Sequence, residues 1–165
     1  MDSSMVNILD HCTDAPIARY EPGAILIDEG RRSGRLFVLM NGEVEVLRGG
    51  TSVAVISEAG AVFGEMSVLL DLPHTAIVRA RTPVAVRAPE DAPTFLRQHP
   101  EIAFYLARLL AQRLNAATTY LVDVKRQYEG HGDHLGMVGE VLEALTVQQS
   151  REFTLGPDRV DDPRM

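Results

Sequence analysis

The sequence predicts an α+β fold, mainly β, in which an antiparallel, jelly-roll-like β-roll is flanked by an N-terminal helix and a long C-terminal helix. Two observations predict this class. Between about residues 15 and 89, short apolar or alternating runs are separated by Gly-rich and polar turns, which is typical of β-sandwiches, rolls and barrels. From Glu101 to Gln127 the chain has neither Gly nor Pro, and its apolar residues recur at helical spacing. With 165 residues, the chain can bury a sizeable core.

The first segment, residues 1–14, is expected to form a short N-terminal helix. Three apolar residues would share one face of it: Met5, Ile8 and Leu9. Ser3 or Ser4 could accept a hydrogen bond from its first turn and so cap it.

The second segment, residues 15–89, reads as strands joined by turns. The expected strands are Ala24–Ile27, Leu36–Met40, Glu43–Leu47, Thr51–Ser57 and Ala76–Val86, the last broken near Thr82-Pro83. Asn41-Gly42 lies between two of these runs, and Asn-Gly in that position predicts a tight hairpin. Gly49-Gly50 predicts a second hairpin, and residues 28–35 predict a polar turn.

The third segment, residues 90–128, reads as helical. Asp91 is placed to cap a short helix through Leu96, and Pro100 is placed at the first position of the next helix. The first half of that long helix is expected to cover the β-roll through Ile102, Tyr105, Leu106 and Leu109. In its second half, apolar residues recur at alternating spacings of four and three: Leu110, Leu114, Ala117, Leu121, Val124 and Tyr128. This heptad seam predicts a homodimer, and the alternative is a helix that only covers its own domain. Residues 129–165 predict a weaker helix at 135–149 and a tail.

Composition excludes several classes of function. The net charge of −7 argues against a nucleic-acid surface, which relies on an excess of Lys and Arg. No apolar run approaches the roughly 20 residues of a membrane span, and the acidic N-terminus does not resemble a secretory signal. The single cysteine, Cys12, cannot form an internal disulfide, which suits a reducing compartment. We therefore expect a cytoplasmic protein that has no membrane span and does not bind DNA.

The segment FGEMSVLLDLPHTAIVRA, residues 63–80, carries the most specific chemistry. Gly60 and Gly64 allow unusual backbone angles and a close approach of ligand to main chain. A helical turn that begins at Glu65 would direct its first N–H groups toward an anion. A carboxylate beside an anion is reasonable only if it faces a hydroxyl, so the pattern favours a ligand with both a phosphate and a sugar. After this turn, His74 and Thr75 offer a possible cation and a hydroxyl.

This segment resembles the phosphate-binding cassette of cyclic nucleotide-binding domains, whose pattern is Phe-Gly-Glu, a small residue, a gap, and then Pro-Arg-Thr/Ala-Ala. Other stretches match the same family in order, and the resemblance covers about residues 4–127. Those stretches are EPG at 21–23, DEG at 28–30, LFVL at 36–39, NGEVEV at 41–46, FLRQHPEI at 95–102 and LAQRL at 110–114. The helices resemble the B and C helices of bacterial catabolite-activator-type regulators. Since 38 residues follow Gln127, we expect no winged helix-turn-helix and a stand-alone domain.

The resemblance implies a role for individual residues. Glu65 would bind the ribose 2′-hydroxyl, and backbone N–H groups near Gly64, Met66 and Ser67 would hold the cyclic phosphate. His74 stands where the family has an Arg that grips the phosphate, and Thr75 would bond a phosphate oxygen or a purine edge. The remaining expected contacts are Thr118 and Thr119, which would close over the base, and Val53, Val55, Val62 and Phe63, which would form apolar walls.

These assignments predict a cyclic nucleotide-binding regulatory domain, for cAMP or cGMP, that signals through its long helix to another, unidentified effector protein. Because His offers one ring N–H where Arg offers a charged fork, two alternatives stay open: a degenerate domain that acts as a protein interaction module, and a binder of another nucleotide or anion. We expect neither catalysis nor a metal. The five histidines are scattered, and the one close pair, His131 and His134, is weak evidence for a metal site.

Overall fold

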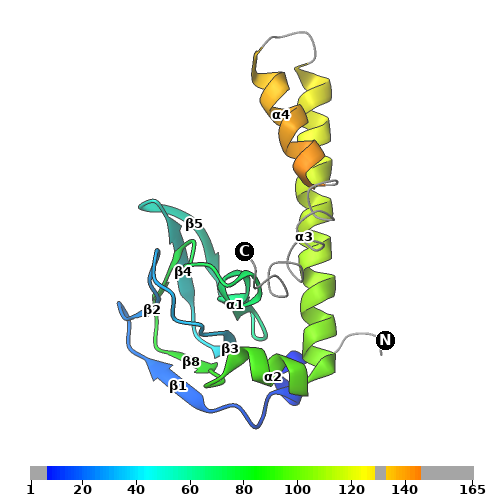
Figure 1. The fold of residues 1–165 in the computed structure, drawn as a ribbon. Helices are drawn as coiled ribbons and strands as arrows, with labels where there is room; N and C mark the ends of the chain where they lie inside the picture. Colours follow the sequence, from blue (N-terminus) through cyan, green and yellow to red (C-terminus); the bar gives the residue numbers. More distant parts are fainter. Residues whose placement is uncertain (1–6, 129–132, 146–165) are drawn as a thin grey trace, which may run out of the picture. The chain divides into compact units, whose positions relative to one another are not determined.

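The structure, a computed structural model, describes residues 7–128 and 133–145 (Figure 1). Its elements in chain order are η1 (Ile8–His11), β1 (Ile17–Tyr20), β2 (Ile25–Ile27), β3 (Phe37–Asn41), β4 (Val44–Arg48), β5 (Thr51–Ile56), β6 (Val62–Phe63), α1 (Glu65–Leu70), β7 (Ile77–Ala80), β8 (Val84–Arg87), α2 (Ala92–Gln98), α3 (Pro100–Gln127) and α4 (Asp133–Glu143). The chain divides into two compact units, residues 1–106 and 107–165. Helix α3 begins in the first unit and continues into the second.

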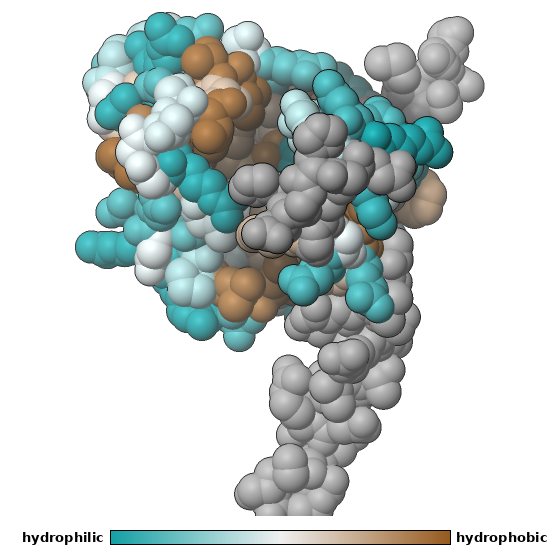
Figure 2. All heavy atoms as spheres, turned by 90° about the horizontal axis from the view of Figure 1, so that it is seen from above, coloured by the Kyte–Doolittle hydropathy of each residue, from teal (hydrophilic) through white to brown (hydrophobic). Residues whose placement is uncertain are grey.

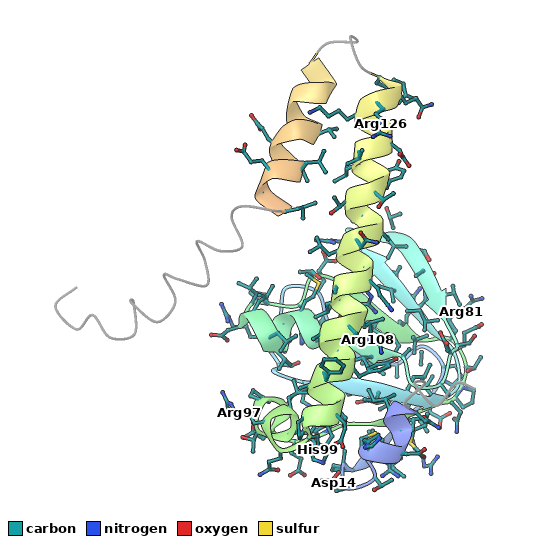
Figure 3. The ribbon with its side chains drawn as sticks, turned by 90° about the vertical axis from the view of Figure 1, so that its right-hand side faces the viewer. Asp14, Arg81, Arg97, His99, Arg108 and Arg126 are labelled. Carbon is teal, nitrogen blue, oxygen red and sulfur yellow. The ribbon has the colours of Figure 1, made fainter. Side chains whose placement is uncertain are left out.

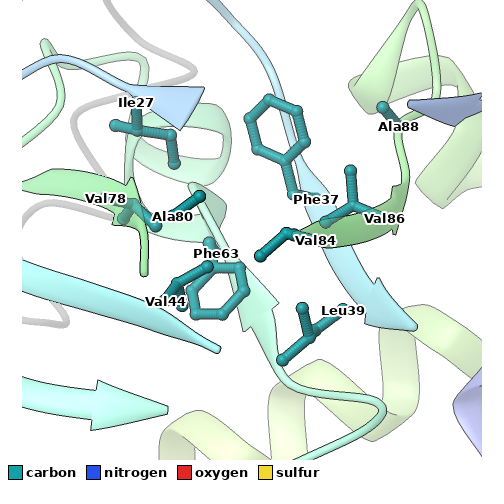
Figure 4. Close-up of a cluster of buried hydrophobic side chains, with 10 residues drawn as sticks. All are labelled: Ile27, Phe37, Leu39, Val44, Phe63, Val78, Ala80, Val84, Val86 and Ala88. Atoms are coloured by element: carbon teal, nitrogen blue, oxygen red, sulfur yellow. The ribbon is translucent and has the colours of Figure 1, made fainter. Parts of the chain in front are cut away.

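The strands of the first unit form two antiparallel sheets of four strands each. One sheet has the order β1-β8-β3-β6 and the other has the order β2-β7-β4-β5. Side chains from both sheets meet in one buried cluster (Figure 4), whose members are Ile27, Phe37, Leu39, Val44, Phe63, Val78, Ala80, Val84, Val86 and Ala88. The predicted antiparallel β-roll flanked by helices is confirmed.

The hairpin predicted at Asn41-Gly42 is wrong. Strand β3 pairs with β6 and β8, whereas β4 pairs with β5 and β7, so the two strands on either side of this turn belong to different sheets. Gly42 has φ of +98°, and a Cβ on it would lie 2.3 Å from the carbonyl oxygen of Pro83. The Thr82 hydroxyl oxygen accepts a hydrogen bond from the backbone N–H of Glu43 at 2.9 Å. Gly42 is therefore a corner between the sheets, and it is packed against the turn that joins β7 to β8.

Other turn predictions are confirmed. Gly49-Gly50 closes the β4–β5 hairpin, in which Arg48 lies opposite Thr51. The break at Thr82-Pro83 separates β7 from β8. Strands β1 and β6 were not predicted as separate elements, because two to four residues are too few to show an alternating pattern.

The described part of the segment predicted as an N-terminal helix contains one helical turn. The described part is the 3₁₀ turn η1, and its cap is Asn7, whose side chain accepts a hydrogen bond from the backbone N–H of Leu9 at 3.1 Å. Ser3, Ser4 and Met5 lie outside the described residues.

Helices α2 and α3 begin where the sequence predicts. The Asp91 carboxylate accepts a hydrogen bond from the backbone N–H of Thr94 at 3.2 Å, and α3 starts at Pro100. Ile102 and Leu106 of α3 are buried. At the junction of the helices, the His99 ring stacks on Phe95 with 4.1 Å between the ring centroids, and its Nε2 lies 3.0 Å from an Asp14 carboxylate oxygen (Figure 3). These contacts join α2 and α3 to the segment that leads into β1.

The second unit contains the rest of α3 and helix α4, which lies alongside it in Figure 1. The predicted helix at 135–149 is α4, and residues 146–149 lie outside the described part of the chain. A Cβ on Gly139 would lie 3.8 Å from Lys125 Nζ, an ordinary contact distance, so this part of α4 lies next to α3. Within the predicted seam Leu114 and Ala117 are exposed, whereas Leu110, Leu121 and Val124 are partly buried. The homodimer stays a prediction.

Candidate functional site

Gly64 gives the cassette its geometry. It precedes α1 with φ of +86°, in the left-handed region that favours glycine, and a Cβ on it would lie 2.3 Å from the carbonyl oxygen of Arg35. No other residue fits both this angle and this approach. The next residue, Glu65, begins α1 as predicted, and its side chain is buried with 7% of its surface exposed. The first backbone N–H groups of α1, which include those of Met66 and Ser67, have no acceptor within the helix.

The end of α1 is closed by two side chains. Asp71 ends the helix in the left-handed conformation, with φ of +55°. Arg32, from the loop between β2 and β3, donates hydrogen bonds from Nη1 to the Asp71 carbonyl oxygen at 2.7 Å and to its carboxylate at 3.2 Å. The buried Ser67 hydroxyl donates to the carbonyl oxygen of Leu72. The Ser67 side chain therefore serves the fold of the turn, which leaves its backbone N–H as the group that could contact a ligand.

The backbone and the ring of His74 are hydrogen-bonded to the loop between β2 and β3. Its carbonyl oxygen accepts a hydrogen bond from Gly30 N–H, and its own N–H donates to the Arg31 carbonyl oxygen, each at 2.8 Å. Its ring Nε2 lies 2.6 Å from the Ser33 hydroxyl oxygen, and 5% of the residue is exposed. Burial lowers the pKa of His74 below its ordinary value, because removal from water disfavours the charged ring. In this structure His74 is therefore a buried, hydrogen-bonded ring that is less basic than a histidine in water.

The two arginines of the β7 region have acidic partners on or next to β4. Arg79 Nη2 donates to the Glu45 carboxylate at 2.8 Å, and this hydrogen bond holds the pKa of Glu45 below its ordinary value. Arg81, labelled in Figure 3, has its Nε 3.8 Å from the Glu43 carboxylate. Each of these arginines therefore has a carboxylate partner on or next to β4.

The other predicted residues lie in different surroundings. Phe63 and Val62 are buried in the core, whereas Val55 and Val53 are 46% and 57% exposed on β5. Thr75 is partly buried, directly after His74. Thr118 and Thr119 lie on α3 in the second unit, so their role over a base stays a prediction.

Sequence reasoning missed the loop between β2 and β3 as part of the site. Residues 28–35 were interpreted only as a polar turn. In the structure Ser33 is hydrogen-bonded to His74, Arg32 is hydrogen-bonded to Asp71, and the carbonyl oxygen of Arg35 lies close to Gly64. The available signal was three arginines and a serine within five residues of one turn.

The comparisons with known proteins agree with this geometry. The sequence profile of the cyclic nucleotide-binding domain family matches residues 17–89. These residues belong to that family. The match runs from the start of β1 to just past β8, so this cyclic nucleotide-binding domain contains Gly64, Glu65 and His74.

Relatives of the domain occur in regulatory proteins. The chain is 33% identical over 78 residues to the cAMP-dependent protein kinase regulatory subunit of Schizosaccharomyces pombe, across 47% of this chain and 19% of that protein. It is 31% identical over 108 residues to the CRP-like cAMP-activated global transcriptional regulator of Mycobacterium tuberculosis, across 62% of this chain and 48% of that protein. The crystal structure of the Thermus thermophilus catabolite activator protein aligns with a TM-score of 0.62 and 27% identity, across 72% of this chain and 58% of that one. The chain thus spans less than half the length of either curated relative.

Cys12 lies outside the cyclic nucleotide-binding cassette. Cys12 is fully buried, its Sγ lies 3.7 Å from the Leu9 carbonyl oxygen, and burial raises the pKa of its thiol, so it is a packed side chain.

Within residues 7–128 and 133–145, no three His, Cys, Asp or Glu side chains gather as a metal site would require. None of the described helices combines the length and apolar character needed to cross a bilayer.

Proposed function

We propose that this chain is a cyclic nucleotide-binding regulatory domain, for cAMP or cGMP, that signals to another protein. The observation that carries the proposal is the cassette itself: Gly64 in the left-handed conformation, buried Glu65 at the start of α1 and buried His74 after that helix, within a domain of this family. Buried ionisable side chains are uncommon and gather at functional sites, so two of them in one cassette support a ligand site.

In this proposal each residue has a distinct role. The backbone N–H groups of Met66 and Ser67, next to Gly64, hold the cyclic phosphate, and Glu65 accepts a hydrogen bond from the ribose 2′-hydroxyl. His74 donates to the phosphate, and Thr75 bonds a phosphate oxygen or the purine edge. Phe63 and Val55 contribute apolar surface, and Thr118 with Thr119 covers the base.

The proposed output is a change in α3. A ligand that draws the cassette inward favours one pose of the helix over another, which is a shift between populated states. Exposed and half-exposed positions on α3, among them Leu110, Leu114, Ala117, Leu121 and Val124, would then present a different dimer seam or effector surface. The effector is a protein whose identity the chain does not reveal.

A second candidate, a protein interaction module without a ligand, is favoured by the surface of α1 and of the turn that follows it. Four apolar side chains there are between 46% and 56% exposed: Met66, Leu69, Leu70 and Leu72. Beside them is an open groove of about 460 Å³ lined by Val68, Leu69, Pro93, Leu96, Arg97, Pro100 and Ala103. Figure 2 shows hydrophobic side chains in separate groups on a largely hydrophilic face.

Thermal unfolding with added nucleotide separates the candidates. A ligand at 100 times its Kd stabilises the folded state by about 2.7 kcal/mol, so cAMP or cGMP at saturating concentration should raise Tm clearly. A rise with AMP, ATP or phosphate but with neither cyclic nucleotide would favour the third reading, a binder of another nucleotide or anion. No rise with any of them would leave the interaction module as the function.

A further inference from the structure

Arg35 stands at the entrance to β3, next to the cassette. It lies two positions before Phe37, the first residue of β3. The Arg35 guanidinium carbon lies 5.4 Å from the centre of the Phe37 ring, which is 1% exposed and belongs to the core cluster. The charged end of Arg35 therefore lies close to a buried aromatic ring.

The Arg35 side chain carries a buried donor that the fold does not use. Its Nε is inaccessible to solvent and has no hydrogen-bond partner among the described residues. A buried donor left without an acceptor is costly, and a charged one more so, so such a group calls for an explanation, of which a bound anion is one. The other two arginines of the same loop differ, because Arg32 is bonded to Asp71 and Arg31 has its Nε 3.9 Å from the Asp28 carboxylate.

A short series of contacts joins Arg35 to His74 and Gly64. The Arg35 backbone N–H donates to the Ser33 hydroxyl oxygen at 3.2 Å, and that oxygen lies 2.6 Å from His74 Nε2. On the other side, the Arg35 carbonyl oxygen is the atom that a Cβ on Gly64 would meet. Three segments that are far apart in the sequence therefore meet here: residues 33–35, Gly64 with Glu65, and His74.

We propose that Arg35 supplies the guanidinium of the anion site, and that it and His74 together bind a phosphate or phosphodiester group. A guanidinium is charged at every physiological pH and can donate two hydrogen bonds to one phosphate, which a single imidazole cannot. Ser33 is a positioning residue that holds the His74 ring through Nε2. The proposal rests on the proposed function only in taking a cyclic nucleotide as the source of the phosphate.

The test compares Arg35→Gln with Arg19→Gln, which makes the same change of charge at an exposed residue of β1. Binding of cAMP and of inorganic phosphate is measured by calorimetry for both variants and for the original chain. Loss of a charge-assisted contact should weaken binding of both ligands by roughly tenfold to a hundredfold in Arg35→Gln, and by less than about twofold in Arg19→Gln. Affinity in Arg35→Gln within twofold of the original overturns the proposal.

Two further outcomes are informative. If the original chain binds phosphate through Arg35 but does not bind cAMP, the anion site stands and the cyclic-nucleotide function fails. If it binds neither, both fail. Should Arg35→Gln not fold, as judged by circular dichroism, Arg35→Lys is scored instead. Lysine keeps the charge but loses the fork, so binding should still fall by roughly tenfold, and unchanged binding would overturn the assignment.

Discussion

Replacement of Gly64 by Ala tests whether the cassette turn has the geometry described above. Two effects add at this position. An L-residue held near φ of +86° costs roughly 1–2 kcal/mol, and forcing a methyl group into a packed site typically costs a further 1–3 kcal/mol. The second effect applies because the new Cβ would lie 2.3 Å from a backbone oxygen of Arg35, which cannot move as the end of a flexible side chain would. The variant should therefore lose about 2–5 kcal/mol of unfolding free energy.

Gly23→Ala is the matched control for this experiment. Gly23 has almost the same backbone angle, with φ of +90°, but nothing lies within 4 Å of the Cβ that Ala would add. It should lose only the conformational part, roughly 1–2 kcal/mol. Urea unfolding followed by circular dichroism measures both variants. Equal losses at the two positions would refute the close approach of Gly64 to Arg35.

Three further predictions concern the ligand and the histidine. Glu65→Ala should weaken cAMP binding by roughly tenfold or more, whereas 2′-deoxy-cAMP should bind the variant and the original chain with equal affinity. An equal loss of affinity for both ligands would show that Glu65 does not bind the ribose 2′-hydroxyl. His74→Arg should strengthen cAMP binding at neutral pH by at least about tenfold in a calorimetric titration, and unchanged affinity would show that residue 74 does not face the phosphate. Because the pKa of His74 is lower in the folded chain than in the unfolded chain, the unfolded state binds more protons as pH falls below about 6.5, so stability should fall in that window. The fall in Tm between pH 7.5 and pH 5 should be smaller in His74→Asn than in the original chain. An equal fall in both proteins would contradict the burial of a neutral His74 ring.

Local signals predicted much of the fold. Asp91 as a cap, Pro100 at a helix start and Gly49-Gly50 in a hairpin depend on neighbours only a few residues away, and all three are confirmed. Asn41-Gly42 gave the wrong strand pairing because a glycine with positive φ is suited both to a tight hairpin and to a corner between two sheets. The choice depends on β6 and β8, which are far along the chain from this turn.

Sequence reasoning found the cassette but not the loop between β2 and β3. The cassette is a contiguous segment, so Gly64, Glu65 and His74 could be singled out from their spacing, and the structure gives Gly64 a left-handed conformation and buries Glu65 and His74. The loop between β2 and β3 could not be predicted as part of the site, because Ser33 is 41 positions from His74 and a run of polar residues does not reveal which of them contact the cassette. Val53 and Val55 illustrate the same limit, since β5 is an edge strand of its sheet and its residues 51–55 are all exposed.

Amide chemical-shift mapping by NMR is the decisive test of whether the cassette binds a cyclic nucleotide, because it reports both binding and the residues involved. On titration with cAMP or cGMP, the largest shifts should fall on Gly64 to Ser67 and on His74 and Thr75, and they should saturate. Shifts confined to the groove residues between α1 and α2, or no shifts at millimolar nucleotide, would contradict binding at the cassette.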